Sequence, residues 1–358
     1  MKLVVILPGM TRGGIDFFQS LLDKHSQISQ LPGKFYIDEY IQKIQKDTSA
    51  LSLARVFIEC YPEYFNSKLA SEERHNFLGQ NKDEYYTVNK DQFTKSFINL
   101  QNKEKNPNIR QIIINLNLAY SESLGENIFK KKLVVLQVHH ISRISPIKNL
   151  DFDILFTIRN PIASHSAYIS NLAFFEKKTP SAWQFNFHLE RNFTHFKKIT
   201  EFKKKTYVVK MEDVHLNNIK VMNNFCKEFG LIYEESMKSS TFNGKLWWGD
   251  RVGKRDLNGI NTNFKNNINE NLFFKKDIAT FEYLLSTIFV KYNYSVSILN
   301  QSSLRYLRYL PFKFDYVIFY RNLIKGNLKE LFFSIYYYFK RIKFMYKKLK
   351  LENFPIQL

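Results

Sequence analysis

Short unbroken apolar runs alternate along the chain with longer segments whose apolar residues recur at helical spacing. The runs lie at Leu3–Leu7, Leu133–Val138, Ile154–Ile158 and Tyr207–Lys210. Such runs are typical of strands buried on both faces of a parallel sheet. The helical spacing covers about 15–24, 36–60, 91–101, 109–119, 162–175, 181–201 and 217–229. Strands that alternate with helices predict an α/β fold, a parallel sheet flanked by helices.

The strand signal nearly disappears between about 40 and 130, where Lys, Asn, Glu and Tyr are frequent. We expect this segment to be a mostly helical insertion that covers an acceptor site. With 358 residues the chain can bury a large core. The sequence contains no internal repeat, so we expect one α/β domain over residues 1–300 and a separate extension over 301–358.

A glycine-rich segment joins the first apolar run to the first helical pattern. It reads Pro8-Gly9-Met10-Thr11-Arg12-Gly13-Gly14-Ile15-Asp16. The first N–H groups of a helix lack intrahelical partners and carry the positive end of its dipole, so this turn predicts an anion cradle. Arg12 adds a guanidinium group that suits phosphate or sulfate oxygens. The segment therefore predicts a P-loop-like fold with its ligand at the carboxyl ends of the strands.

Gly9 and Gly14 have the spacing of a Walker A motif, but the two positions that follow do not fit one. A nucleotide triphosphatase needs Lys and Ser or Thr there to reach the terminal phosphates and to hold Mg²⁺. This chain has Ile15 and Asp16 instead. The loop thus disfavours a P-loop kinase and favours transfer from a phosphate-bearing donor without a metal clamp. A plain strand–turn–helix crossover with tightly packed glycines is the alternative for the loop alone.

The charge of the chain is strongly positive, with a formal net charge of +20. It indicates attraction to anionic partners. Cys60 and Cys226 are too few for a disulfide framework or a metal cluster, which favours a reducing compartment. We expect neither a signal peptide nor a spanning helix, because charges follow the first apolar run closely and no apolar stretch reaches about 20 residues. The expected location is the cytoplasm or the cytoplasmic face of a membrane.

The composition shifts near Ser303. From Leu304 to Lys350 there are twelve Lys and Arg against Asp315 and Glu330, and aromatic residues interleave with them, as in Phe332–Phe339. This pattern favours a basic, aromatic amphipathic segment that lies on an anionic membrane surface. A terminal helix pair that packs on the domain with a solvated basic face is the alternative. No nucleic-acid recognition motif accompanies the charge, so we expect no nucleic-acid partner.

A second basic turn follows another predicted strand. Ile154–Ile158 ends in Arg159-Asn160-Pro161, and Pro is natural at the start of the next helix because its missing N–H costs nothing there. The carboxyl ends of neighbouring parallel strands share one crevice. We therefore expect Arg159 and Arg12 to clamp two separate phosphates of one nucleotide.

In this order, the motifs resemble those of sulfotransferases that use 3′-phosphoadenosine 5′-phosphosulfate. The loop 8–16 and Leu21–His25 resemble the family's 5′-phosphosulfate loop, and Arg159-Asn160-Pro161 resembles the opening of its 3′-phosphate motif. Three later segments are also similar to family motifs: Val209–Val214, Phe225–Leu231 and Thr241–Asp250, the last as in a bacterial, carbohydrate-sulfotransferase-like branch. The resemblance covers about residues 1–300.

The resemblance implies how a donor would be bound. Arg12 would contact the sulfonate and the 5′-phosphate and assist catalysis, and Arg159 would bind the 3′-phosphate. The same implication assigns further donor contacts to the N–H groups of Gly13, Gly14, Ile15 and Asp16, to Ser166, which stands one position before the family serine at Ala167, and to Lys254 and Arg255. For Lys254 and Arg255 a solvated charged turn is equally open. The resemblance implies no metal.

The candidate base lies in Gln137-Val138-His139-His140, which resembles the family strand that ends in Lys-Thr-His. Sulfonyl transfer to a hydroxyl needs a base for its proton, and histidine suits proton transfer near neutral pH. The alignment favours His139 over His140, and a histidine that is bonded within the fold is the alternative. Asp16, Gln137 and Met211 depart from the family pattern, which has Ser or Thr, Lys and Tyr at those places.

The resemblance implies a sulfotransferase that moves a sulfonyl group from 3′-phosphoadenosine 5′-phosphosulfate to a hydroxyl, leaving 3′-phosphoadenosine 5′-phosphate. A carbohydrate or glycolipid is the expected acceptor, given the insertion and the basic surface. Two alternatives stay open from the residues. One is a non-catalytic binding module of the same fold, which the departures favour, and the other is a P-loop-like kinase.

Overall fold

A parallel sheet of six strands lies at the centre of the computed structural model, in the order β2-β3-β1-β4-β5-β8. The structure describes residues 1–44, 48–70, 73–176, 181–202, 204–249, 259–266, 268–296, 306, 309–345 and 354–358. The strands are β1 (Lys2–Pro8), β2 (Ile28–Lys34), β3 (Leu133–Gln137), β4 (Asp153–Ile158), β5 (Thr206–Lys210) and β8 (Ile356–Gln357). Two short strands, β6 (Thr241–Phe242) and β7 (Lys245–Leu246), pair separately in antiparallel fashion.

The four predicted strands are confirmed as β1, β3, β4 and β5, each within one residue of its predicted ends. Their side chains are almost entirely buried, because helices cover both faces of the sheet. β1 pairs with β3 on one side and β4 on the other, in parallel. The loop after β1 therefore leaves the sheet between the ends of two neighbouring strands.

The sequence pattern did not reveal β2, whose sequence is Ile-Ser-Gln-Leu-Pro-Gly-Lys. It is the edge strand beside β3, and its pairing shifts register between Gln30 and Lys34. Proline removes a ladder donor and is confined to edges and irregular positions, so Pro32 is tolerated here. A polar, proline-containing segment gives no apolar run, although the fold buries nearly all of it.

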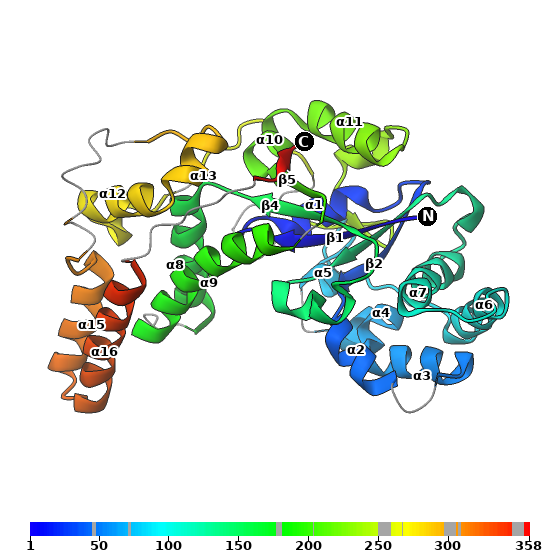
Figure 1. Ribbon diagram of the computed structural model, residues 1–358, viewed down its shortest axis with the longest axis horizontal. Helices are drawn as coiled ribbons and strands as arrows, with labels where there is room; N and C mark the ends of the chain where they lie inside the picture. Colours follow the sequence, from blue (N-terminus) through cyan, green and yellow to red (C-terminus); the bar gives the residue numbers. More distant parts are fainter. Residues whose placement is uncertain are drawn as a thin grey trace.

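Helices surround the sheet and account for every predicted helical segment (Figure 1). They are α1 (Ile15–Leu22), α2 (Ile37–Lys43), α3 (Ala50–Cys60), α4 (Pro62–Phe65), α5 (Glu73–Asn76), α6 (Lys90–Asn102), α7 (Ile109–Ser123), α8 (Pro161–Glu176), α9 (Ala182–Glu201), α10 (Met211–Leu216), α11 (Asn218–Phe229), α12 (Lys275–Leu284), α13 (Ser286–Lys291), α15 (Lys313–Ile324) and α16 (Leu328–Met345). The 3₁₀ turns are η2 (Ser67–Leu69), η3 (Ile128–Lys130), η4 (Ile141–Ile147), η5 (Glu235–Lys238) and η7 (Glu270–Leu272). The expected helix over 36–60 is divided into α2 and α3.

The segment between β2 and β3 is helical and has its own aromatic core. Phe57 of α3 packs against Phe35, Tyr61 and Phe93, with ring centroids 5.1–6.1 Å apart. α7 lies against β2, so this helical insertion covers the β2 side of the sheet.

The C-terminal helices form a basic helical extension at the opposite end of the molecule (Figure 1). α15 and α16 form a tight hairpin through Gly326, whose φ of 61° allows the turn. α16 packs on α9. The predicted boundary near residue 300 lies outside the described residues. In the part of the chain that the structure describes, none of the helices combines the length and the apolarity needed to cross a bilayer.

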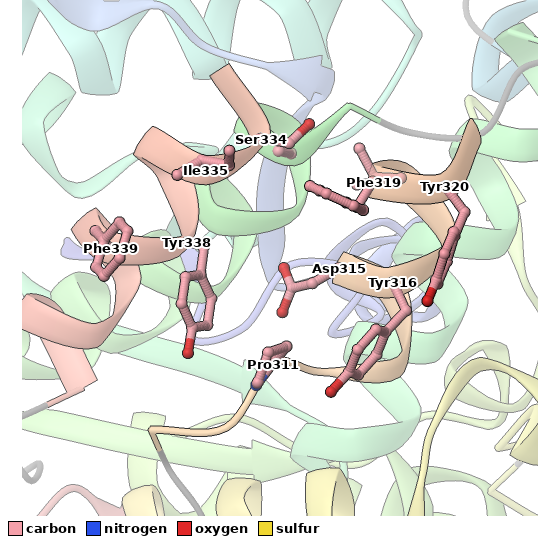
Figure 2. A pocket seen from close by; sticks show the side chains of 11 residues that line it. Pro311, Asp315, Tyr316, Phe319, Tyr320, Ser334, Ile335, Tyr338 and Phe339 are labelled. Carbon is pink, nitrogen blue, oxygen red and sulfur yellow. The ribbon is translucent and has the colours of Figure 1, made fainter. Parts of the chain in front are cut away.

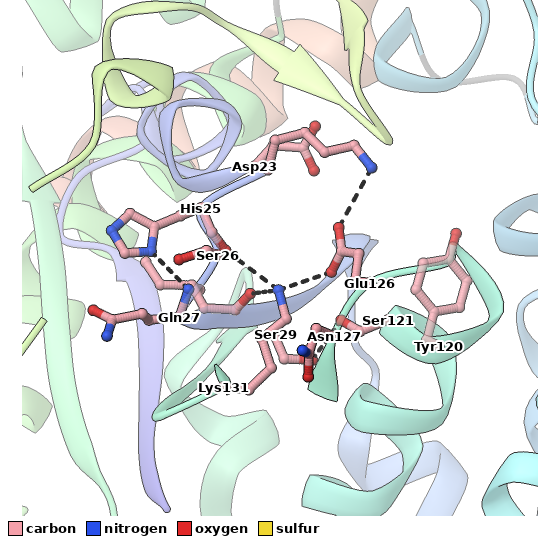
Figure 3. A network of polar contacts seen from close by, with 12 residues as sticks. Asp23, His25, Ser26, Gln27, Ser29, Tyr120, Ser121, Glu126, Asn127 and Lys131 are labelled. Carbon is pink, nitrogen blue, oxygen red and sulfur yellow. Dashed lines mark hydrogen bonds and ion pairs between the residues drawn. The ribbon is translucent and has the colours of Figure 1, made fainter. Parts of the chain in front are cut away.

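A buried lysine fixes the connection between the end of α1 and the start of β2 (Figure 3). Lys131 Nζ donates to the carbonyl oxygens of Ile28 at 2.6 Å and His25 at 3.3 Å, and it lies 2.8 Å from Glu126 Oε2. Its side chain is 1% exposed. When one partner of a buried ion pair is removed, the other is left buried without a counter-charge. The loss in free energy of unfolding is then larger than the net contribution of the pair.

We predict that Lys131→Met lowers the free energy of unfolding by about 3 kcal/mol, because it leaves Glu126 and two carbonyls without their cation. Urea denaturation followed by circular dichroism measures the change. Lys130→Met is the matched control, since Lys130 is exposed on the neighbouring position. Equal stability of the two variants would contradict this role for Lys131.

Candidate functional site

The carboxyl ends of β1, β3 and β4 meet at one edge of the sheet, and the glycine-rich loop lies among them. The Gly9 N–H donates to the Thr157 carbonyl at 2.9 Å, which ties the loop after β1 to the end of β4. The Ser164 hydroxyl of α8 donates to the Thr11 carbonyl, which adds a second link from the β4 side. Arg12 and Arg159 thus follow neighbouring strands at the same edge, as the sequence predicted.

The backbone of the loop turns sharply before α1. Arg12 and Gly14 both have positive φ, 58° and 78°. Such turns bring successive N–H groups to one concave side, where anions bind. A Cβ on Gly13 would lie 2.7 Å from the Met10 carbonyl oxygen and 2.9 Å from that of Thr157, so this position requires glycine. The sequence therefore has glycine where a side chain would collide with neighbouring backbone.

Of the four N–H groups predicted to form the anion cradle, that of Gly13 is already bonded within the turn. The Gly13 N–H donates to the Met10 carbonyl at 3.0 Å and is engaged within the turn. Gly14 is the N-cap of α1, and no side chain forms a cap there. The N–H groups of Gly14, Ile15 and Asp16 begin the helix, where donors lack intrahelical partners. Helix geometry places these three N–H groups at the positive end of the helix dipole.

The side chain of Asp16 is the centre of a polar network from three parts of the chain. Arg74 Nη1 of α5 lies 2.7 Å from Asp16 Oδ1, and the Gln137 amide of β3 also donates to that oxygen. Arg74 donates in addition to Gln137 Oε1 at 2.7 Å. Asp16 therefore has a fixed counter-charge, and the helical insertion reaches the loop through Arg74.

The ionised form of Asp16 is strongly favoured. Burial alone would raise the pKa of this carboxyl group. The charge of Arg74 and the hydrogen bond with His139 outweigh burial and hold the pKa of Asp16 well below its usual range. At neutral pH the group is a carboxylate neutralised by Arg74, so it does not cancel the positive field of the helix end.

Of the two adjacent histidines, His139 is the one that faces the loop. β3 ends at Gln137, so strand alternation does not apply to either residue. His139 Nε2 lies 3.5 Å from Asp16 Oδ1 and 3.2 Å from the Gln137 amide nitrogen. Burial lowers the pKa of His139, although Asp16 opposes the shift, and the imidazole is therefore neutral at neutral pH.

His140 has a different environment. Its Nδ1 accepts the Ser142 N–H at 3.3 Å and thereby caps η4. Its ring packs edge-on against His195 of α9, with centroids 4.7 Å apart. Burial and the charges of Arg191, Lys198 and Arg143 lower its pKa. These contacts connect His140 to η4 and α9.

Arg159 lies at the end of β4 beside a stack of aromatic rings. Its guanidinium carbon is 5.6 Å from the centre of the Phe264 ring, and its Nε donates to Asn266 Oδ1 at 3.3 Å. His215 stacks between Phe264 and Phe17 of α1, with centroids 4.5 Å away on each side. Burial, with the charge of Arg159, lowers the pKa of His215 to about 4. The neutral stack joins Arg159 to the first turn of α1.

The other predicted donor contacts are less supported by the geometry. The Ser166 hydroxyl is buried and accepts the Asn269 N–H at 2.9 Å, whereas Ser164 is the serine that reaches the loop. Lys254 and Arg255 lie outside the described residues. Met211, at the place of the family tyrosine, packs beneath Gly14, where an added Cβ would meet its side chain at 2.7 Å.

α9 also contacts the loop after β1, through residues that the sequence did not predict. Asn192 Oδ1 accepts the Thr11 N–H at 2.9 Å, and His195 Nδ1 lies 3.1 Å from the Pro8 carbonyl oxygen. Arg191 donates to the His139 carbonyl at 2.7 Å. Arg74 and Asn192 have no motif of their own, and only long-range contacts reveal them. The described residues contain no group of three or more His, Cys, Asp or Glu side chains arranged to hold a metal ion.

Comparisons with known proteins give distant structural similarities only. No family model matches the chain, and no curated protein matches it. Among solved structures, it is similar to the sulfotransferase domain from the Synechococcus PCC 7002 olefin synthase, with a TM-score of 0.38 and 15% identity over 71% of this chain and 80% of that one. It is also similar to the sulfotransferase domain from the curacin biosynthetic pathway, with a TM-score of 0.38 and 14% identity over 86% of this chain and 95% of that one.

The backbone of Arg12 provides a test of the loop conformation. Left-handed geometry costs a non-glycine residue about 1–2 kcal/mol. We predict that Arg12→Gly has a free energy of unfolding about 1 kcal/mol higher than that of Arg12→Ala, because both variants lose the guanidinium and only glycine relieves the backbone. Chemical denaturation of the two variants measures the difference. A higher stability of the alanine variant would contradict the strained loop.

Proposed function

We propose that the chain is a sulfotransferase that moves a sulfonyl group from 3′-phosphoadenosine 5′-phosphosulfate to a hydroxyl of a carbohydrate or glycolipid. The observation that carries the proposal is the convergence of the start of α1, Arg159 and His139 at one sheet edge. This transfer needs hydrogen-bond donors for the phosphosulfate, a cation for the second phosphate and a base for the hydroxyl proton. The motif resemblance supplies the identity of the donor.

The donor fits the residues that are present. The N–H groups of Gly14, Ile15 and Asp16 provide donors for the phosphosulfate end, beside the Arg12 guanidinium. Arg159, on the neighbouring strand end, suits a second phosphate. Phe17 and Phe264 stack on a neutral His215 beside Arg159, and we propose that the flat base of the donor binds near this aromatic stack.

The proposed transfer is direct. The oxygen of the acceptor hydroxyl forms a bond to sulfur while the bond between sulfur and the bridging phosphate oxygen breaks, and the hydroxyl proton passes to His139. Asp16, 3.5 Å from Nε2, stabilises the imidazolium that results. Charge that develops on the departing 5′-phosphate meets Arg12 and the helix start. 3′-Phosphoadenosine 5′-phosphate leaves as the second product.

Two of the departures from the family pattern, Asp16 and Gln137, are connected in this chain through Arg74. Asp16, Gln137 and Arg74 bond to one another, so the carboxylate, the amide and a guanidinium replace the usual hydroxyl and lysine. The charge of Arg74 offsets the negative charge that Asp16 adds beside the loop. The P-loop kinase alternative gains no support, since Ile15 is buried at the position of the Walker lysine.

Binding of 3′-phosphoadenosine 5′-phosphate tests the donor assignment. We predict submicromolar affinity by titration calorimetry, and at least about a hundredfold loss in Arg12→Ala and in Arg159→Ala, since each removes a charge-assisted contact to phosphate. Lys90→Ala, a change in an exposed lysine of α6, is the control and should bind as the parent does. Absence of binding in the parent protein would rule out the proposed donor.

Turnover tests the base. We predict that His139→Ala lowers kcat by about 10²–10⁴-fold with unchanged affinity for 3′-phosphoadenosine 5′-phosphate, while His140→Ala retains most of its activity. Because burial lowers the pKa of His139 below its usual 6.5, kcat should stay constant near neutrality and fall only when acid protonates the imidazole below that value. Assays with labelled donor and a panel of hydroxyl acceptors measure both effects. Greater loss in His140→Ala would reverse the assignment, and donor binding with no turnover on any acceptor would favour a binding module.

A further inference from the structure

The hairpin of α15 and α16 carries a continuous apolar face on its outer side. On α15 the exposed large side chains follow helical spacing and share one face: Tyr316, Val317, Tyr320, Leu323 and Ile324. On α16 they recur in the same manner: Leu328, Phe332, Phe333, Ile335, Tyr336 and Phe339. Ile324 is 84% exposed and Phe332 72%. Contiguous apolar surface of this kind marks a site of interaction with a protein or a membrane.

The inner side of the hairpin is packed, and this packing fixes the orientation of both helices. Arg341 of α16 is 3% exposed and donates to Asp315 of α15 through two nitrogens, one of them at 2.8 Å. It also donates to Asn186 Oδ1 of α9 at 3.2 Å, and Asn186 in turn donates to the Tyr337 carbonyl at 2.8 Å. These contacts fix which side of each helix faces outward.

A cavity of about 350 Å³ opens between the two helices (Figure 2). Its walls are mainly apolar and aromatic, and they include Tyr316, Phe319, Ile335 and Phe339. Figure 2 shows Asp315 between the two helices, among these aromatic side chains. The size and lining are those of a site for an apolar group. Because several lining residues also belong to the outer face, the cavity is continuous with that face.

The hairpin is also strongly basic. Between residues 309 and 345 there are seven Lys and Arg against two acidic residues, and one of the seven is the Arg341 bound to Asp315. Lys325, Lys329, Lys340 and Lys343 are exposed at the turn and along α16. Lysines that flank an apolar helical face are attracted to an anionic lipid surface, each by about 1 kcal/mol.

We propose that the outer face of the α15–α16 hairpin docks on an anionic lipid bilayer, with its aromatic and aliphatic side chains in the interface and an acyl chain in the cavity. A second copy of this chain would bring the same positive charges together, which opposes a symmetric dimer through this face. A nucleic acid would match the charge but leave the aliphatic residues in water. An anionic bilayer satisfies both the charge and the apolar surface.

α9 connects this face to the candidate site. Its first turns carry Trp183 and Phe187, which are exposed and stack with centroids 5.3 Å apart. Aromatic side chains of this kind favour the bilayer interface. Asn192, which binds the loop, follows Trp183 by nine residues, or about 14 Å along a helix. If the proposed transfer holds, this geometry favours acceptors anchored in the membrane, but the docking itself does not depend on that transfer.

Vesicle co-sedimentation of the full chain tests the apolar part of the proposal. The chain should bind vesicles of phosphatidylcholine mixed with phosphatidylglycerol and bind vesicles of pure phosphatidylcholine at least about tenfold more weakly. Leu328→Ser/Phe332→Ser should lower binding to the mixed vesicles by at least about tenfold, because two exposed apolar side chains are lost. The matched control is Phe129→Ser/Ile232→Ser, which changes residues that are equally exposed elsewhere.

A second pair of variants tests the charge. Lys325→Glu/Lys329→Glu should weaken binding to the mixed vesicles at least about tenfold, while Lys103→Glu/Lys105→Glu, the same charge change beside α6, should have a smaller effect. Equal binding to both vesicle types, or equal losses in test and control variants, would overturn the proposal. A lipid-free dimer that Leu328→Ser/Phe332→Ser converts to monomer in light scattering would also overturn it, and would assign the face to a second copy.

Discussion

An acidic side chain in the first turn of α1 must be neutralised before that helix end can attract another anion. Asp16 occupies this place, and Arg74 lies 2.7 Å from its carboxylate. The guanidinium group comes from α5, in the helical insertion, and also bonds to Gln137 at the end of β3. The ion pair therefore links the loop, the insertion and the neighbouring strand. Without it, the carboxylate would oppose the positive charge that the helix dipole brings to that place.

A strand of the sheet could be predicted where its burial requires a run of apolar residues. β1, β3, β4 and β5 are central strands covered on both faces, so each is an apolar run. β2 is an edge strand whose Pro32 and polar residues erase that trace, although the fold buries them. The division of residues 36–60 into α2 and α3 was not predicted, because apolar spacing continues across the break, although Ser49 caps the start of α3. Periodicity reports which residues are buried, and edge pairing requires knowledge of the neighbouring strand.

The residues of the candidate site also fall into those that the sequence could predict and those that it could not. Glycines and arginines that follow strands could be predicted, because parallel strands bring their carboxyl ends to one edge. The choice between His139 and His140 could not be argued from strand alternation, since β3 ends before both. Arg74, Asn192 and Arg191 reach the site from distant segments with no spacing to identify them. Sequence therefore identifies the groups that follow the strand ends, and tertiary contacts identify the groups that position them.

The left-handed backbone at Arg12 has a quantitative implication for selection. Glycine would adopt this φ of 58° without strain, so an arginine is worth keeping here only if its side chain contributes more than the backbone loses. A loss of about 1 kcal/mol corresponds to roughly a fivefold change in a dissociation constant. For the proposed anion contact, that factor is the gain in affinity from the guanidinium that would match the backbone strain.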